Sequence, residues 1–315
     1  MRPGWLRPVG ATGLQVSAIG AGGGPLGSMP ATFGRDVPAA DGIATVGAVL
    51  ASDITLLDTS NGYGGGESER RIGAALAAAG GVPDGFVLAT KVDPDDNGRF
   101  DAARVRRSVE ESLGRLGVDR VDLLHLHDPE FSLTFEEAMA AGGPVAELER
   151  IRDEGIAGHL GVAGGDIALM RRFVETGRFE VLLTHNRYTL VDRSAEETID
   201  VAHRRGVAVI NAAVLGGGIL AVGATRSDHY AYRPASAATL AAIAAIEELC
   251  ADYGVPLAAA ALQFSLRDQR ISSTLVGFSR PDRVAETLHL AAADIPADLW
   301  DRVERHVPPP ENWMW

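Results

Sequence analysis

Short apolar segments alternate with helix-like segments along almost the whole chain, and this alternation limits the possible folds more than any other feature. Eight apolar runs have the length of buried strands. They are residues 17–20, 54–57, 86–91, 121–127, 158–162, 181–184, 207–211 and 273–276. Apolar residues recur at helical spacing between them, at residues 37–51, 67–79, 104–116, 144–154, 167–176, 195–205, 235–251, 256–266 and 281–290.

Eight strands that are each followed by a helix indicate an α/β fold, the (β/α)8 TIM barrel, in which all loops after the strands share one face. We expect one domain over residues 1–315, since such barrels run to about 250 residues or more. A β-hairpin over residues 5–16 could plug one end of the barrel. An extra helix is expected between strands seven and eight.

A doubly wound sheet is the alternative fold. Against it, the glycine-rich stretch of residues 22–28 after the first strand contains no G-x-G-x-x-G that runs directly into a helix. We therefore favour the barrel.

The composition limits the kind of partner. A net charge of −13 and a pI near 5.1 argue against a nucleic-acid groove or an anionic membrane surface as partner, so a small molecule is expected. Cys250 is the only cysteine, which favours a reducing compartment. With no apolar leader and no run of 18 apolar residues, a cytoplasmic protein is expected. The sequence does not predict an oligomeric state.

Four polar residues follow strand ends that a barrel would bring to one mouth. Asp58, Lys91 and His127 end apolar runs, and Tyr63 lies on the loop after Asp58. Taken singly, each has an ordinary structural explanation. Asp58 could cap a helix and Lys91 could form a salt bridge. His127 could be hydrogen-bonded in the core, and the ring of Tyr63 could simply pack. Together they are harder to explain that way, because a lone buried ammonium is unfavourable and Asp58 could neutralise it. A cation beside Tyr63 is expected to lower its pKa from about 10, which suits proton exchange.

Asp58, Tyr63, Lys91 and His127 resemble, in order and approximate spacing, the catalytic tetrad of the aldo-keto reductase family. The resemblance extends over nearly the whole chain and includes the hairpin and residues 108–117, 186–190 and 276–281. Residues 187–190, 217–220 and 256–264 are most similar to the branch of D-threo-aldose, L-fucose and pyridoxal dehydrogenases.

The resemblance implies a chemistry and a cofactor. Tyr63 would exchange the proton, and Lys91 and Asp58 would adjust its pKa. His127 would orient the carbonyl or hydroxyl while hydride passes to or from a nicotinamide. Arg280 would suit a ribose 2′-phosphate, so NADP is favoured, with NAD possible. The implied cofactor contacts are Gly23, Gly24, His185, Leu215, Gly216, Gly217, Gly218, Gly277, Phe278, Ser279, Arg280, Arg283 and Thr287.

Several positions depart from the family pattern. Strand five ends in Ala163 and Gly164, where many relatives have Ser-Asn, and strand six offers His185 in place of Gln. Ala212 replaces the aromatic residue that stacks on the nicotinamide in many relatives. Ser279 and Thr287 replace residues that are often Arg and Asn, which leaves the choice between NAD and NADP open.

The C-terminal tail follows three prolines that cannot continue a helix. A disordered end is one reading. However, family members let this segment close over the barrel mouth, and two exposed tryptophans would form an unexplained apolar patch. We therefore expect Trp313 or Trp315 to form a wall of the substrate pocket.

Two other functions compete with an oxidoreductase that acts on an aldose, pyridoxal or a small aldehyde. A metal-dependent hydrolase could use His125, His127, Asp128 and His185, but strand eight offers no carboxylate. No metal is therefore expected, and His125 is better explained as an inward-facing residue below the site. The second alternative is an idle cofactor-sensing module, against which the complete tetrad argues.

Overall fold

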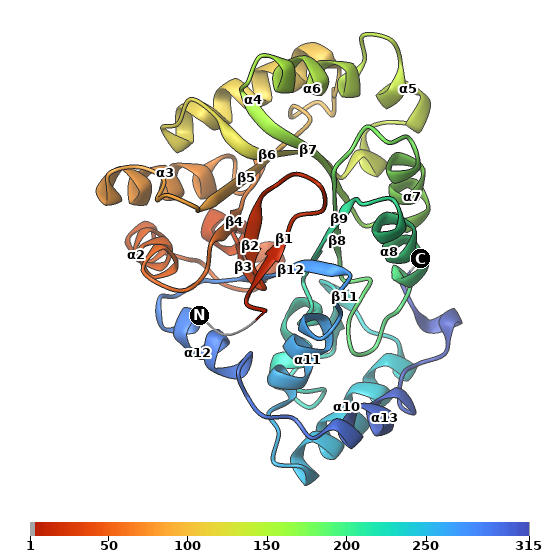
Figure 1. Cartoon of the computed structure of the whole chain (residues 1–315). Coiled ribbons are helices and arrows are strands. Elements are labelled where there is room, and N and C mark those ends of the chain that lie inside the picture. The colour runs from red at the N-terminus through yellow and green to blue at the C-terminus, as the bar shows by residue number, and fades with distance from the viewer. Residues whose placement is uncertain (1–3, 315) are drawn as a thin grey trace.

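The computed structural model describes residues 4–314, and its centre is a closed barrel of eight parallel strands (Figure 1). The strands follow one another around the barrel in sequence order, and the last pairs with the first. They are β3 (Ile19–Gly22), β4 (Leu56–Asp58), β5 (Val87–Val92), β6 (Val121–His127), β7 (Ala157–Gly164), β8 (Val181–His185), β9 (Ala208–Ala212) and β12 (Ile271–Gly277).

All eight predicted strands are present, and their ends differ from the prediction by two residues or fewer. At the carboxyl ends, β4 continues through Asp58 and β8 through His185. Pairing with the neighbouring strand decides where a strand ends, and a polar side chain does not interrupt the backbone ladder. The barrel fold predicted from the alternation is confirmed.

Helices surround the barrel (Figure 1). The helix α4 shows why they form where they do: Asp101 accepts a hydrogen bond from the N–H of Arg104, an apolar stripe is buried, and Gly117 ends the helix at φ 69°. The main helices are α2 (Ala39–Leu50), α3 (Glu67–Ala79), α4 (Ala102–Leu116), α6 (Pro144–Asp153), α7 (Ile167–Glu175), α8 (Glu196–Arg204), α10 (Ala237–Asp252), α11 (Leu257–Leu266), α12 (Asp282–Leu290) and α13 (Ala297–Glu304).

The extra helix between strands seven and eight is confirmed, since α10 and α11 both lie between β9 and β12. Short elements in the loops were not predicted, because they are too short to show a period. They are α1 (Pro30–Phe33), α5 (Phe135–Met139), α9 (Ile219–Val222), the two-stranded ribbon of β10 (His229–Tyr230) and β11 (Arg233–Pro234), and the 3₁₀ turns η1 (Gly24–Gly27), η2 (Pro129–Phe131), η3 (Gly216–Gly218) and η4 (Pro310–Asn312).

The hairpin of β1 (Leu6–Pro8) and β2 (Gln15–Ser17) lies across one end of the barrel (Figure 1). Val9 and Val16 are fully buried and belong to the same apolar cluster as side chains from the barrel strands. The predicted plug is therefore present, and it closes the end opposite the loops that follow the strands.

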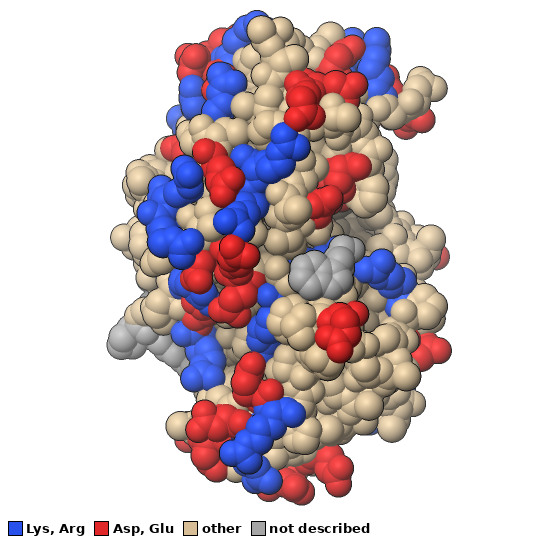
Figure 2. Space-filling view, turned by 90° about the vertical axis from the view of Figure 1, so that its right-hand side faces the viewer, with Lys and Arg blue, Asp and Glu red and all other residues tan. Residues whose placement is uncertain are grey.

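Charged side chains of both signs alternate over the face shown in Figure 2. Between residues 4 and 314, no single helix is long and apolar enough to cross a membrane. The helices α10 and α11 together have the length and composition of a span, but they are bent by 101°.

Candidate active site

The four residues that the sequence placed at strand ends meet in one cavity of about 370 Å³ at the barrel mouth. Asp58 ends β4, Lys91 lies near the end of β5, and His127 ends β6, while Tyr63 reaches in from the loop after β4. Parallel strands end on one face, so three separate sequence segments can present polar groups to the same space.

Lys91 is the centre of the hydrogen-bond network. Its Nζ donates to Asp58 Oδ2 at 2.5 Å and to the carbonyl oxygen of Thr59 at 2.6 Å. It also lies 3.3 Å from the hydroxyl of Tyr63 and 4.7 Å from the centre of that ring. Although burial opposes its charge, Asp58 and Tyr63 hold the pKa of Lys91 above its ordinary value. The lysine is therefore a fixed cation beside the phenol.

The prediction that the pKa of Tyr63 is lowered is wrong, although Lys91 acts on it in the predicted direction. Burial of the phenol outweighs the attraction of Lys91 and raises the pKa of Tyr63 to about 12. The sequence showed the cation but could not show how little water reaches the ring. Tyr63 is consequently protonated at neutral pH and is placed to donate a proton to a carbonyl oxygen.

His127 is held by a carboxylate that the sequence analysis did not identify. The Nδ1 atom lies 2.6 Å from Asp93 Oδ1 and 3.1 Å from Ser60 Oγ. Asp93 is fixed in turn, because its other oxygen accepts from the N–H of Gly62 at 2.7 Å. A carboxylate only accepts hydrogen bonds, so Nδ1 carries a proton and Nε2 is left for the substrate.

The charge on His127 follows from its neighbours. Burial opposes the imidazolium, but the carboxylates of Asp93 and Asp128 outweigh it and raise the pKa of His127 above its ordinary value. Its ring meets that of Tyr63 edge to face, with the centres 5.6 Å apart. A signal for Asp93 did exist: it lies two residues after Lys91, on the same side of an extended chain.

His125 lies below the site, as predicted. It is fully buried and pairs in register with Lys91 and Gly161. Burial, followed by the charges of Lys91 and His127, lowers the pKa of His125 well below its ordinary value, so its ring is neutral. A Cβ atom on Gly161 would lie only 2.1 Å from His125 Nδ1, so this glycine makes room for the ring.

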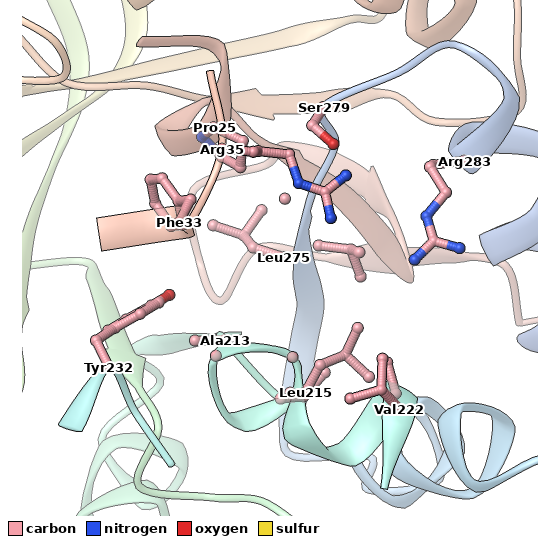
Figure 3. A pocket seen from close by; sticks show the side chains of 16 residues that line it. Pro25, Phe33, Arg35, Ala213, Leu215, Val222, Tyr232, Leu275, Ser279 and Arg283 are labelled. Carbon is pink, nitrogen blue, oxygen red and sulfur yellow. The ribbon is translucent and has the colours of Figure 1, made fainter. Parts of the chain in front are cut away.

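A second cavity of about 230 Å³ adjoins the first and shares Pro25, Phe33 and Tyr232 with it (Figure 3). We call it the cofactor groove, because the predicted cofactor residues Gly217, Gly218 and Ser279 line it. Arg35 and Arg283 point into it from opposite sides, and Ser279 also lines it (Figure 3). Gly217 and Gly218 have φ values of 76° and 112°, which other residues rarely adopt. A bare backbone with two guanidinium groups suits a phosphate.

The predicted cofactor residues divide into two groups. Some line the two cavities: Gly23, Gly24, His185, Leu215, Gly217, Gly218, Gly277, Ser279 and Arg283. The others are not part of that lining: Gly216, Phe278, Arg280 and Thr287. In this second group, Phe278 is buried in the apolar core, and Arg280 forms an ion pair with Asp282 at 3.3 Å.

Arg35 and Tyr232 line the cofactor groove but were missed by the sequence analysis. Arg35 follows α1, and Tyr232 lies at the turn between β10 and β11. Tyr232 meets Phe33 edge to face at 5.6 Å, and both rings line the groove and the catalytic cavity. Ala212 also lines the catalytic cavity.

The C-terminal tail reaches the loop that follows β8. The backbone N–H of Met314 donates to Asp192 Oδ2 at 2.8 Å, and its Sδ lies 3.3 Å from Arg187 Nη1. Trp313 turns back, since its indole N–H donates to the carbonyl oxygen of Pro308, and it is not among the residues that line the three cavities at the mouth. Trp315 lies outside the described residues.

Residues 4–314 contain no group of three or more His, Cys, Asp or Glu side chains arranged to hold a metal ion. His127 and His185 do approach Asp128, at 3.8 and 3.6 Å. The pKa of Asp128 is lowered to about 2, because the attraction of His127 and the hydrogen bond with His185 outweigh its burial.

Three proteins of similar sequence are dehydrogenases. L-galactose dehydrogenase of Arabidopsis thaliana is 32% identical, with 98% of this chain and 96% of that protein aligned. D-threo-aldose 1-dehydrogenase of a Pseudomonas species is 31% identical over 92% of this chain and 94% of its own length. Pyridoxal 4-dehydrogenase of Microbacterium luteolum is 30% identical over 93% and 95% of the two chains.

Solved structures have the same fold at lower identity. An aldo-keto reductase from Bacillus halodurans superposes with a TM-score of 0.76 at 21% identity, covering 97% of this chain and 96% of that one. A glycerol dehydrogenase from Gluconobacter oxydans gives 0.75 at 22% identity, covering 98% of each chain. The model of the aldo/keto reductase family matches residues 18–308. The chain therefore belongs to the aldo/keto reductase family.

Proposed function

We propose that this family member is an NADP-dependent oxidoreductase that interconverts an aldose or a similar hydroxyaldehyde with its oxidised or reduced partner, with Tyr63 as the proton carrier. That it is an NAD(P)-dependent oxidoreductase follows from the family. The observation that carries the proposal is the contact of Lys91 with both Asp58 and Tyr63 in a cavity that His127 also lines.

The side chains divide the proton chemistry between them. A carbonyl oxygen between Tyr63 and His127 can accept a hydrogen bond from His127 Nε2 and the proton of the phenol. Lys91 stabilises the phenolate that remains, and Asp58 keeps the ammonium in place. The bound nicotinamide supplies or accepts the hydride. In the oxidative direction the same oxygen of Tyr63 takes the proton from the substrate hydroxyl.

Replacing Tyr63 with Phe tests the assignment. The change deletes the proton carrier and leaves the cofactor groove intact, so we expect kcat to fall roughly 10²–10⁴-fold. The affinity for NADPH, measured by quenching of protein fluorescence, should stay within about twofold. A variant with near-normal turnover would show that another group carries the proton.

A panel of aldoses, pyridoxal and small aldehydes with NAD and NADP, read at the absorbance of the reduced nicotinamide, separates substrate classes. We expect turnover of at least one aldose or hydroxyaldehyde. Tight NADPH binding without turnover of any compound would favour a cofactor-sensing module instead.

The preference for NADP rests on the arginines around Ser279. Arg283 lines the groove, although Glu286 accepts from it at 2.6 Å, while Arg280 lies outside the lining. A charge-assisted contact to the 2′-phosphate contributes about 1.5–3 kcal/mol, and NAD has no such group. We therefore expect Arg283→Ala to weaken NADP binding at least tenfold more than NAD binding in calorimetric titrations. Arg280→Ala should discriminate less, because Arg280 pairs with Asp282 outside the lining. Equal losses for both cofactors would assign these arginines to another role.

A further inference from the structure

A third cavity, of about 620 Å³, opens beside the catalytic one on the side away from the cofactor groove. It shares Phe131 and His185 with the catalytic cavity, whereas the groove shares Phe33 and Tyr232 with it. The three cavities thus follow one another across the mouth, with the catalytic one in the middle. We call the third the side cavity. Its other lining residues are Glu130, Gly165, Asp166, Ile167, Ala168, Arg171, Arg187, Ser194, Glu197, Thr198, Arg233 and Met314.

Arg187 is a buried cation without an ion pair in the described part of the chain. Only 9% of the residue is exposed, and the one hydrogen-bond acceptor of its guanidinium is the thioether of Met314 at 3.3 Å. The nearby carboxylate of Asp192 instead accepts from the N–H and hydroxyl of Ser194 and from the N–H of Met314. An unpaired buried guanidinium is unfavourable unless a ligand supplies the missing anion.

A second guanidinium increases the positive charge of the side cavity. Arg233 lines it and forms no ion pair within residues 4–314, and its charge disfavours that of Arg187. The third arginine, Arg171, is neutralised by Glu175 and Glu197. Two like charges that share a cavity repel each other, and an anion between them would relieve that repulsion.

The carboxylates of the side cavity already have donors. Glu130 Oε1 accepts from the N–H groups of Gly165 and Asp166, Asp166 accepts from the N–H of Leu169, and Glu197 accepts from Arg171. None of them lies within ion-pair distance of Arg187 or Arg233. Arg187 and Arg233 are therefore the two cations of the cavity that form no ion pair in the described part of the chain, although Arg233 is exposed to water and Glu130 Oε2 accepts no hydrogen bond there.

Arg187 also lies close to the catalytic cavity. A Cβ atom on Gly165 would lie 3.4 Å from Arg187 Nη2 and 3.1 Å from His185 Cε1, so the guanidinium and the imidazole border the same space. His185 in turn lines the cavity that holds Tyr63 and His127. A substrate of a few carbon atoms could reach from one to the other.

We propose that the side cavity binds an anionic group of the substrate, a carboxylate or a phosphate, through Arg187 and Arg233 while the carbonyl carbon lies at Tyr63. This inference rests on the proposed function, and it deepens it by naming a substrate class: hydroxyaldehydes or aldoses that carry an acid group at the end remote from the carbonyl. A planar guanidinium binds either anion through two parallel hydrogen bonds.

Matched pairs of aldehydes test the charge separately from the shape. Reduction of 4-carboxybenzaldehyde is compared with that of its methyl ester, and glyceraldehyde 3-phosphate with glyceraldehyde, using NADPH. We expect the wild-type kcat/KM to be at least about tenfold higher for an anionic member, and the arm with the larger ratio distinguishes carboxylate from phosphate. Arg187→Gln should then reduce kcat/KM for that anion by about 10–100-fold through KM, and leave the neutral member within about twofold.

Arg172→Gln is the matched control, because Arg172 lies on α7 next to the side cavity but pairs with Glu136 on the surface. In Arg172→Gln, the ratio of kcat/KM between the anionic and the neutral aldehyde should be unchanged for both pairs. Arg233→Gln is the second variant, in case Arg187→Gln does not fold. It should lower kcat/KM for the preferred anionic aldehyde relative to its neutral partner. Equal kcat/KM for both members of each pair in the wild type, or an equal loss for both in Arg187→Gln, would overturn the proposal while the oxidoreductase assignment stands.

Anion binding can be measured without turnover, so the anion site can be tested separately from the oxidoreductase activity. Calorimetric titration of the NADP complex with benzoate and with inorganic phosphate measures anion binding directly. Binding by the wild type that is lost in Arg187→Gln supports the side cavity even if none of the aldehydes is reduced. No binding of either anion, or equal binding by both proteins, counts against it.

Discussion

At the scale of single residues, the pair of Asp93 and His127 sets the protonation of the site. Asp93 fixes the proton on Nδ1, so a neutral His127 would present an acceptor to the substrate and a charged one a donor. Because the pKa of His127 is raised, the donor form extends to higher pH than for an ordinary histidine. Carbonyl reduction needs that form, and it is lost as the pH rises through the pKa of His127.

Replacing Asp93 with Asn should therefore move the upper limb of the pH profile for reduction. Loss of the carboxylate removes the main cause of the raised pKa of His127, so that pKa falls and kcat/KM begins to decrease at lower pH. The check is kcat/KM for one neutral aldehyde between pH 5 and 10. At pH 5 the variant should retain most of its activity, and an unmoved limb would show that His127 does not titrate in this range.

At the scale of elements, short segments outside the barrel strands complete the mouth. The turn between β10 and β11 brings Tyr232 over to Phe33 beside α1, and the tail brings Met314 to Arg187. Each contact joins segments that are far apart in the sequence. The barrel strands provide Asp58, Lys91 and His127, whereas these additions line the cavities around them.

Deleting residues 311–315 should change substrate binding and leave cofactor binding unchanged. The deletion removes the thioether at Arg187 and the N–H at Asp192, so the side cavity opens and the buried ion gains water. We expect KM for the preferred aldehyde to rise about three- to tenfold, since a charged contact in water is weaker, while the Kd of NADPH stays constant. Unaltered substrate kinetics would exclude the tail from the substrate site.

At the scale of the whole molecule, the two ends of the barrel have separate tasks. The hairpin closes one end with Val9 and Val16, and the opposite end holds three cavities in a row. Changes at the closed end should therefore alter stability without altering catalysis, as is typical of TIM barrels.

Replacing Val16 with Ala tests this division. Two buried methylene equivalents are lost and a small cavity is left, so the free energy of unfolding in urea should fall by roughly 1.5–3 kcal/mol. Leu6→Ala is the control, since 39% of Leu6 is exposed, and it should cost less than about 0.5 kcal/mol. The kcat/KM of folded Val16→Ala should equal that of the wild type. A large loss of activity at full folding would show that the hairpin acts on the mouth.

The sequence by itself determined the barrel and which polar residues meet at its mouth. Alternating apolar runs fix which segments become strands, and a parallel barrel must bring Asp58, Lys91 and His127 to one face. These are consequences of local pattern and topology, so they can be read without coordinates.

Only the tertiary structure decided the electrostatics and the walls of the site. The pKa of Tyr63 depends on how much water its neighbours exclude, and the charge of His127 depends on Asp93 from another strand. Arg187 is ordinary in the sequence, and it becomes notable only because folding buries it and leaves its nearest carboxylate to other donors. Burial and pairing are properties of three-dimensional neighbourhoods, which the order of residues along the chain does not specify.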